Sequence, residues 1–457
     1  MSLSRNIVVL RRLSYKSSFA FGTNLRCAAA STTSRCGCNF SSIGSISNNN
    51  SNNNTSPVIR WGILSTGRIA SDFVKAMSLV ENAKAVAVAA RSSTSASTFA
   101  SLHSIPTHHT SYQELISNPN IDIIYIATIA DHHYTYAKAS ILAGKHVLIE
   151  KPMTLSHSQT LELITLAQSK HVFLMEGMWT RCFPALHKLR ELIASNDIGP
   201  IVYVQGDFGY AFPSEYSSSD RIWFPNSGGI TYDVGMYIAQ FGRIAFPKSK
   251  IKDVQAVGTM KNGVDYTVMA TVTYDRSLAC ENSNGGSEHN ADDIMCSNES
   301  SSTSSEEGST VGMLQMVLTG ASNTEERCVL QGTLGRIILD GPFHVPQRLR
   351  VVYNDGRRRG ESDNSSSGNS NNSNNSIDVS GCTDSNNNNE VVHDFPLHKD
   401  PYQGEWNNPG SIGLVYQINE VADALRMGKT ECDSFTWQDS LDVARIIDKI
   451  VRQVRGK

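Results

Sequence analysis

Apolar and polar positions follow a repeating two-part pattern over residues 57–176. Short runs rich in β-branched residues cover 58–64, 84–90, 121–128, 146–150 and 172–175. Amphipathic stretches of helical period lie between them, at 67–80, 95–103, 132–143 and 156–169. This alternation is typical of βαβ units, in which crossover helices cover both faces of a parallel sheet. The sequence therefore predicts an α/β domain with a doubly wound parallel sheet.

The pattern changes after Pro200. Strand-like runs follow one another at 201–209, 252–258, 264–275, 311–319, 326–331, 335–340 and 348–353. Helical patterns at about 411–428 and 437–453 come last. Residues 177–457 are thus predicted to form an α+β domain built on a mainly antiparallel open sheet. Stretches rich in Asn and Ser, at about 281–310 and 357–390, interrupt it as low-complexity inserts, which we expect to be solvated loops.

The first 56 residues differ in composition from the rest. Residues 1–71 carry eight Lys/Arg and no Asp or Glu, and residues 5–16 form a cationic amphipathic pattern. A Ser-rich, acid-free leader of this kind is typical of organelle transit peptides. We expect residues 1–56 to be a transit peptide for the mitochondrial matrix; the alternatives are plastid import, or a disordered leader on a cytoplasmic protein.

Charge and cysteine usage exclude several classes of protein. Subtracting those eight basic residues from 40 leaves 32 Lys/Arg against 43 Asp/Glu, so the remaining chain has no basic field for nucleic acid. The nine cysteines lack zinc spacing and the histidines lack a coherent ligand set, so no metal site is predicted. No apolar run approaches the roughly 18 residues of a membrane-spanning helix, so no membrane partner is expected.

The first apolar run ends directly before a helical stretch, at Ser65-Thr66-Gly67-Arg68-Ile69-Ala70. A Rossmann domain uses such a strand-to-helix turn to place a dinucleotide pyrophosphate on a helix N-terminus. Ser65 and Ala70 stand where the fingerprint has its first and third glycines, which leaves Gly67 for the close approach to phosphate. An ordinary turn is the alternative. The predicted cofactor-binding residues here are Ser65, Thr66, Gly67, Arg68 and Ile69.

The second apolar run is followed by Arg91 and Ser92 and lacks the acidic residue that binds the ribose 2′-hydroxyl of NAD. A guanidinium pairs with phosphate through two parallel hydrogen bonds, whereas an acid would repel it. We therefore predict that Arg91 and Ser92 bind a 2′-phosphate and that NADP is the cofactor. The alternative is a solvated surface arginine.

Two further positions suggest a chemical site. Lys151 follows the run at 146–150 and precedes Pro152, so it lies at the carboxyl edge of the predicted sheet, where such sheets bind ligands. Asp233 and Tyr237 lie four residues apart at the start of a predicted helix and so share one face. A solvated lysine and a packed tyrosine are the alternatives.

Three segments carry a resemblance to a known family: AGKHVLIEKP at 143–152, MEGMWTRCFPA at 175–185 and GGITYDVGMY at 228–237. In this order they resemble the Gfo/Idh/MocA oxidoreductases, and within them the dimeric, NADP-dependent dehydrogenases of trans-dihydrodiols and D-xylose. Residues 127–133 correspond to the family's Ala-Thr-Pro-Asn-x-x-His segment. Thr128 and His133 match it, whereas Ile129 and Ala130 depart from it.

The resemblance implies roles for these residues. Lys151, Asp233 and Tyr237 would form the catalytic group, with Trp179 and Arg181 near the substrate pocket. Thr128, His133, Glu150 and Lys151 would contact the cofactor, and Glu150 would support the lysine. An ammonium beside the phenol would lower the pKa of Tyr237, and Asp233 would orient Lys151 or the substrate. Whether Tyr237 or Lys151 accepts the proton stays open.

The expected reaction is hydride transfer between the nicotinamide and a secondary or anomeric hydroxyl of a sugar or trans-dihydrodiol. The resemblance also implies a homodimer formed through the open face of the second sheet. Two alternatives remain. One is a dehydrogenase of another polyol such as inositol, and the other is a non-catalytic regulator that binds NADP(H).

Overall fold

The computed structural model describes residues 57–215, 217, 220–275, 311–354 and 389–456. The described residues belong to one compact unit, 56–457. The predicted transit peptide lies outside the described residues, as do nearly all positions of the two low-complexity stretches. Among the described helices, none is both long enough and apolar enough to cross a membrane.

Six parallel strands form the first sheet, in the order β3-β2-β1-β4-β5-β6. The strands are β1 (Ile59–Leu64), β2 (Ala83–Ala89), β3 (Thr107–His109), β4 (Ile123–Ile126), β5 (His146–Ile149) and β6 (Leu174–Glu176). The strand order reverses between β1 and β4, which is where doubly wound sheets bind ligands at their carboxyl edge. The predicted Rossmann-type parallel sheet is confirmed.

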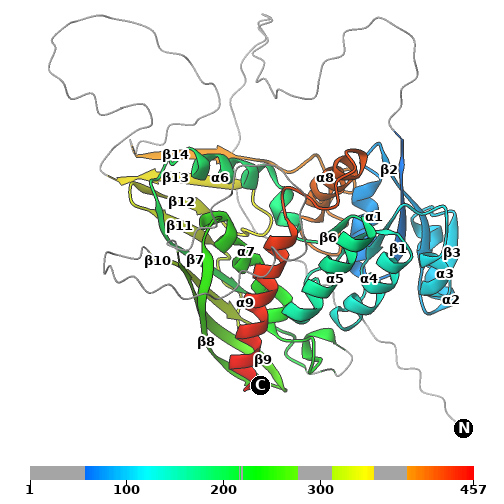
Figure 1. Ribbon diagram of the computed structural model, residues 1–457, viewed down its shortest axis with the longest axis horizontal. Helices are drawn as coiled ribbons and strands as arrows, with labels where there is room; N and C mark the ends of the chain where they lie inside the picture. Colours follow the sequence, from blue (N-terminus) through cyan, green and yellow to red (C-terminus); the bar gives the residue numbers. More distant parts are fainter. Residues whose placement is uncertain (1–56, 216, 218–219, 276–310, 355–388, 457) are drawn as a thin grey trace, which may run out of the picture. The chain divides into compact units, whose positions relative to one another are not determined.

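Crossover helices cover this sheet (Figure 1): α1 (Arg68–Met77), α2 (Ser93–Leu102), α3 (Tyr112–Ile116), α4 (His133–Leu142) and α5 (His157–Lys170). Aromatic packing fixes helix α1 over the point where the strand order reverses. Its Phe73 stacks on Tyr125 of β4, with ring centroids 3.7 Å apart, and meets the edge of Trp61 of β1 at 5.4 Å. These fully buried rings set where the N-terminus of α1 meets the strand ends.

Eight strands form the second sheet, in the order β14-β13-β12-β11-β7-β10-β9-β8. They are β7 (Ile201–Gly209), β8 (Lys250–Lys261), β9 (Val264–Asp275), β10 (Val311–Thr319), β11 (Cys328–Gly332), β12 (Gly335–Leu339), β13 (Arg348–Tyr353) and β14 (Glu390–Asp394). Neighbouring strands are antiparallel except for the parallel pair β7 and β10. The predicted mainly antiparallel sheet is therefore confirmed.

Helices pack on the inner face of the second sheet and connect it to the first. Helix α7 (Met236–Ala245) lies against β7 and β10, and α9 (Trp437–Arg455) packs on α7, β8 and α5. Figure 1 shows α9, in red, running beside β8. Helix α6 (Pro184–Ala194) contacts β13, and α8 (Leu414–Arg426) packs on α1. The two sheets thus hold one continuous core between them.

Four of the described strands and α-helices were not predicted from the sequence: β3, α3, α6 and β14. Strand β14 begins at Glu390, the last position of the stretch predicted to be a low-complexity loop, and it pairs with β13 at the edge of the sheet. Val391 of β14 is partly buried and packs against the core, which helps to hold this strand on the sheet.

Candidate active site

A cavity of about 1220 Å³ opens at the carboxyl edge of the first sheet. Its walls come from the turns after β1, β4 and β5, from the start of α7, from β7, and from loops at 341–347 and 408–411. Most of the residues predicted from the sequence line it: Ser65, Gly67, Arg68, Ile69, Thr128, His133, Glu150, Lys151, Trp179, Asp233 and Tyr237. Four predicted residues do not line it: Thr66, Arg91, Ser92 and Arg181.

The turn after β1 is shaped to receive a ligand. Gly67 has φ −71° and ψ 174°, a conformation open to any residue, and a Cβ added there would meet no protein atom closer than 3.8 Å. Neither backbone strain nor packing within the chain therefore requires a glycine at this place. Gly67 precedes the first turn of α1, where no side chain caps the helix. A dinucleotide pyrophosphate would fit against the first N–H groups of α1, and its close approach would account for a residue without a side chain here.

Ser65 stands at the position of the fingerprint's first glycine and has φ 108°. Non-glycine residues rarely adopt this conformation, so the backbone here is strained. The Ser65 N–H donates to the carbonyl of Ala89 on β2, which holds the turn in place. The chain thus keeps the backbone geometry of a glycine turn although the glycine is replaced.

Thr128 and His133 line the other side of the cofactor region. The Thr128 hydroxyl is buried and has no hydrogen-bond partner within the described residues. A bound dinucleotide would supply that partner. The His133 ring nitrogens lie 2.8 Å from the Pro152 carbonyl and 3.0 Å from the Thr128 carbonyl. Burial lowers the pKa of His133, although the two carbonyls oppose this shift. A neutral ring has one N–H and donates to only one of the two carbonyls at a time.

Asp233 interacts with the positively charged side chains of the site. It lies in a π-helical turn, Thr231–Gly235, directly before α7. Lys151 donates through Nζ to the Asp233 carbonyl at 2.7 Å and lies 3.7 Å from the carboxylate. Arg221 donates to the same carboxylate at 2.7 Å, and the Tyr210 hydroxyl also binds it. Burial alone would raise the pKa of Asp233, but Arg221 and Lys151 outweigh it and keep the group ionised.

Tyr237 lies in the cavity wall, but its proton is held more tightly than the sequence predicted. The Trp179 indole donates to its hydroxyl oxygen at 2.9 Å. Burial and the neighbouring Glu150 raise the pKa of Tyr237 well above its ordinary value. Lys151 sits 5.2 Å from the ring centroid, with its hydrogen bond made to Asp233. The predicted lowering of the Tyr237 pKa by Lys151 is therefore wrong.

Glu150 lies beside Lys151 in the cavity wall. Its carboxylate accepts a hydrogen bond from the Tyr125 hydroxyl at 2.5 Å, and burial raises the pKa of Glu150. No hydrogen bond joins this carboxylate to the Lys151 ammonium within the described residues. Glu150 interacts with Lys151 through charge and through the Lys151 backbone N–H, and Tyr125 of β4 orients its side chain.

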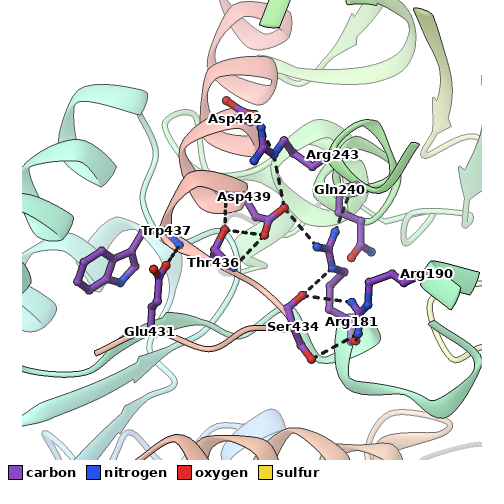
Figure 2. Close-up of polar contacts among 10 residues, drawn as sticks. All are labelled: Arg181, Arg190, Gln240, Arg243, Glu431, Ser434, Thr436, Trp437, Asp439 and Asp442. Carbon is purple, nitrogen blue, oxygen red and sulfur yellow. Dashed lines mark hydrogen bonds and ion pairs between the residues drawn. The ribbon is translucent and has the colours of Figure 1, made fainter. Parts of the chain in front are cut away.

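Arg181 has a different place from the one expected. Figure 2 shows it pointing toward the start of α9, where it donates to the carbonyls of Ser434 and Gln240 and to the Asp439 carboxylate. Asp439 also closes the capping box of α9 with Thr436. The guanidinium is buried and absent from the cavity lining. The predicted position near the substrate pocket is thus wrong: Arg181 connects three chain segments.

Arg91 and Ser92 follow β2, next to the end of β1. Arg91 is exposed, and Ser92 caps α2 by accepting from the Ser95 N–H at 3.3 Å. Because β2 pairs with β1, both residues lie beside the Ser65 turn but outside the cavity.

Several residues that line the cavity were not predicted from the sequence, among them Tyr210, Arg221, Glu326 and His344. Arg221 and Tyr210 bind Asp233, and Glu326 and His344 lie in a separate part of the wall. They come from loops, the end of β7 and a short 3-10 helix, all outside the recognised motifs. No local pattern marks them, because only the folded chain places them at the cavity.

Comparisons with known proteins agree with this architecture. A family model described as oxidoreductase family, NAD-binding Rossmann fold, matches residues 59–178, and one for the GFO/IDH/MocA C-terminal domain matches 186–295. A trans-1,2-dihydrobenzene-1,2-diol dehydrogenase of Sus scrofa is 35% identical over 399 residues, 87% of this chain and 97% of the relative. The enzyme of that name from Xenopus laevis is 37% identical over 218 residues, 47% of this chain and 65% of the relative.

The fold also matches solved structures. An aldose-aldose oxidoreductase from Caulobacter crescentus, complexed with glycerol, has a TM-score of 0.62 at 17% identity. The match covers 87% of this chain and 98% of that chain. At this identity the likeness concerns the fold.

Proposed function

Because the chain belongs to the Gfo/Idh/MocA family of oxidoreductases with an NAD-binding Rossmann fold, we propose that it is an NADP-dependent dehydrogenase. Its substrate would be a sugar or a trans-dihydrodiol, oxidised at a secondary or anomeric hydroxyl. The observation that carries the proposal is the convergence of Lys151, Asp233 and Tyr237 on a cavity that also contains the Gly67 turn. When bound, NADP would supply the hydride acceptor.

Tyr237 is the proposed proton-transfer residue. Trp179 donates to its oxygen, which leaves the phenolic proton free to bind a substrate oxygen. In carbonyl reduction the Tyr237 hydroxyl would give that proton to the alkoxide, and in oxidation the phenolate would take it back. Lys151 stays on Asp233 and supplies positive charge near the reacting oxygen. The Trp179 ring forms part of the wall that excludes water.

The cofactor preference is assigned to Arg91 and Ser92. Arg91 is exposed beside the Ser65 turn, with Tyr112 as a side-chain hydrogen-bond neighbour, and its guanidinium can pair with a 2′-phosphate on the adenosine half of the cofactor. Replacing Arg91 by Asp should invert the NADP/NAD preference in kcat/KM, and an unchanged ratio would refute this assignment. Arg68, which lines the cavity, serves as the control, since its loss should weaken both cofactors alike.

The substrate is tested by a panel. NADP+ reduction is measured with pentoses, hexoses, inositols and trans-1,2-dihydrobenzene-1,2-diol, and NADPH binding is followed in parallel by fluorescence. We expect turnover with a sugar or the dihydrodiol. Turnover confined to inositols would favour the other polyol dehydrogenase. NADPH binding without turnover on any substrate would favour a regulator and overturn the proposal.

The second sheet offers a surface for a homodimer. On its outer face, Met313 pairs with Tyr203 across β10 and β7, and Val257 pairs with Met269 across β8 and β9. These four side chains are 37% to 71% exposed. An apolar sheet face of this kind needs a partner, and a second copy is the proposed one. Sedimentation at micromolar concentration should give a dimer that Met269→Lys disrupts; a monomeric parent would contradict the proposal.

The destination of the protein is proposed from the leader alone. A fusion of residues 1–56 to a fluorescent protein should reach mitochondria, because the segment is cationic, amphipathic and free of acidic residues. Import of the fusion into plastids would mean that the leader targets the plastid and not the mitochondrion. A fusion that stays in the cytosol would refute the targeting proposal.

A further inference from the structure

A histidine and a glutamate face the cavity on the side of the second domain. His344 Nδ1 and Glu326 Oε2 lie 3.0 Å apart, and both residues line the cavity. The two atoms are buried, yet their alignment is not that of a hydrogen bond, and neither has another hydrogen-bond partner in the described parts of the chain. Buried polar atoms normally have a partner, so this pair needs an explanation.

The backbone holds Glu326 in an unusual conformation. Its φ is 52°, in the left-handed region that favours glycine. Its N–H donates to the Asp207 carboxylate at 3.0 Å, and its carbonyl accepts from the Phe343 N–H at 3.0 Å. Strain of this kind persists only where surrounding contacts fix it, and it is common at ligand sites. Here the strain places a carboxylate at the cavity wall.

His344 is held equally firmly, close to the proposed proton-transfer residue. Its carbonyl accepts from the Thr180 hydroxyl at 2.6 Å. Its ring stacks on Phe208, with centroids 4.8 Å apart, and lies 5.4 Å from the Tyr237 ring. A substrate whose reacting carbon is next to the Tyr237 hydroxyl therefore extends within reach of the imidazole.

We propose that His344 and Glu326 together bind a hydroxyl group of the substrate other than the one that reacts. The His344 and Glu326 side chains are 21% and 20% exposed, so each keeps part of its polar group open to the cavity. One hydroxyl can accept a hydrogen bond from an imidazole N–H and donate one to the carboxylate. An aldose has hydroxyls at several carbons beyond the neighbour of the reacting one, whereas a trans-dihydrodiol has a single non-reacting hydroxyl, on the adjacent carbon, and an apolar ring beyond it. The hydroxyl that the pair binds is therefore one that is more than one carbon away from the reacting carbon. The pair is thus a specificity determinant that favours sugars, and this inference rests on the proposed function of the cavity.

The test measures binding, so that it does not depend on turnover. Dissociation constants for D-xylose and for trans-1,2-dihydrobenzene-1,2-diol are measured by calorimetry on the NADPH-saturated enzyme, in which neither alcohol can be oxidised. His344→Phe keeps an aromatic ring on Phe208 but removes the hydrogen bond. We expect the ratio of the two constants to shift toward the dihydrodiol by about 10- to 100-fold. Glu326→Gln, which keeps the shape, should shift it in the same direction, and His344→Gln should restore part of the sugar preference.

A second His–Glu pair provides a matched control. His187 and Glu420 lie 2.9 Å apart outside the cavity, so His187→Phe should leave the ratio unchanged. An unchanged ratio in both His344→Phe and Glu326→Gln would overturn the inference. If the parent binds sugar but oxidises no substrate of the panel, and His344→Phe loses that binding, the pair is supported while the proposed dehydrogenase function fails. Failure of the parent to bind D-xylose or any other aldose would refute the pair as a sugar determinant.

Discussion

Replacing Tyr237 by Phe is the sharpest test of the proposed chemistry. The substitution removes one hydroxyl and keeps the ring among Phe208 and His344. It also leaves the Trp179 N–H without its acceptor. Trp179 is 8% exposed, so this buried donor costs about 1–3 kcal/mol of stability. The protein should therefore stay folded, with a small drop in Tm.

The effect on activity should be much larger. Loss of a general acid or base typically lowers turnover by about 10²–10⁴-fold, whereas NADPH affinity should stay near the parent value. The matched control is Tyr232→Phe. The Tyr232 hydroxyl also lies near the cavity but donates to the Leu155 carbonyl at 2.9 Å, so turnover should stay within a few-fold of the parent.

The pH profile separates proton transfer from simple loss of structure. Because burial and Glu150 raise the pKa of Tyr237, the phenolate needed for oxidation is a minor form at neutral pH. Oxidation by the parent should therefore accelerate as pH rises through the alkaline range, and Tyr237→Phe should lose this slope. If Tyr237→Phe kept nearly full activity at every pH while Lys151→Met abolished it, the proton would travel through Lys151 and the assignment would be refuted.

Three further substitutions test other parts of the structure. Burial raises the pKa of Glu176 from 4.5 to about 7. Between pH 4.5 and pH 7 the folded state therefore keeps a proton that the unfolded chain releases. The free energy of unfolding should fall over this range by at most about 3 kcal/mol. Glu176→Gln removes this loss, and its Tm relative to the parent should rise from pH 5 to pH 8; a constant difference would contradict the assignment. Ser65→Gly should relieve the backbone strain at φ 108° but also adds conformational entropy to the unfolded chain. The net effect should be a stabilisation of about 1 kcal/mol in thermal unfolding. Ser65→Ala should not stabilise the protein. Arg455→Met removes the ion-pair partner of the buried Asp265 carboxylate and should lower the free energy of unfolding by about 3–5 kcal/mol. The exposed Arg452→Met is the control and should lower it by less than about 1 kcal/mol. Equal losses would show that the buried pair has no special role.

Sequence patterns predicted both sheets because burial follows the periodicity of apolar residues. The runs that became β1, β4 and β5 are buried along most of their length, so apolar residues dominate them. Strand β3 escaped notice because it has three residues, two of them histidines. Helix α6 did carry a signal, since Pro184 opens it and Leu186 and Leu189 face the core at helical spacing.

Residues of the candidate site could be predicted only where they belong to a recognisable sequence motif. Short motifs placed Lys151, Asp233 and Tyr237 at one cavity, because strand ends and helix starts have defined positions in this fold. They did not give side-chain direction, so Arg181 was placed beside the pocket although it turns toward α9. Contacts between distant segments have no local signature, which is why the His344–Glu326 pair was not found.

The direction of the Tyr237 pKa shows why such contacts decide the chemistry. A lysine near a phenol lowers its pKa only if the charge reaches the hydroxyl and the group stays solvated. Lys151 instead donates to the Asp233 carbonyl, and the Tyr237 hydroxyl is buried beside Glu150. The folded chain therefore keeps Tyr237 protonated at neutral pH, the state required to donate a proton to a carbonyl oxygen. We expect reduction of the carbonyl substrate to be faster than oxidation of the alcohol at neutral pH, and the two rates to approach each other as the solution becomes alkaline.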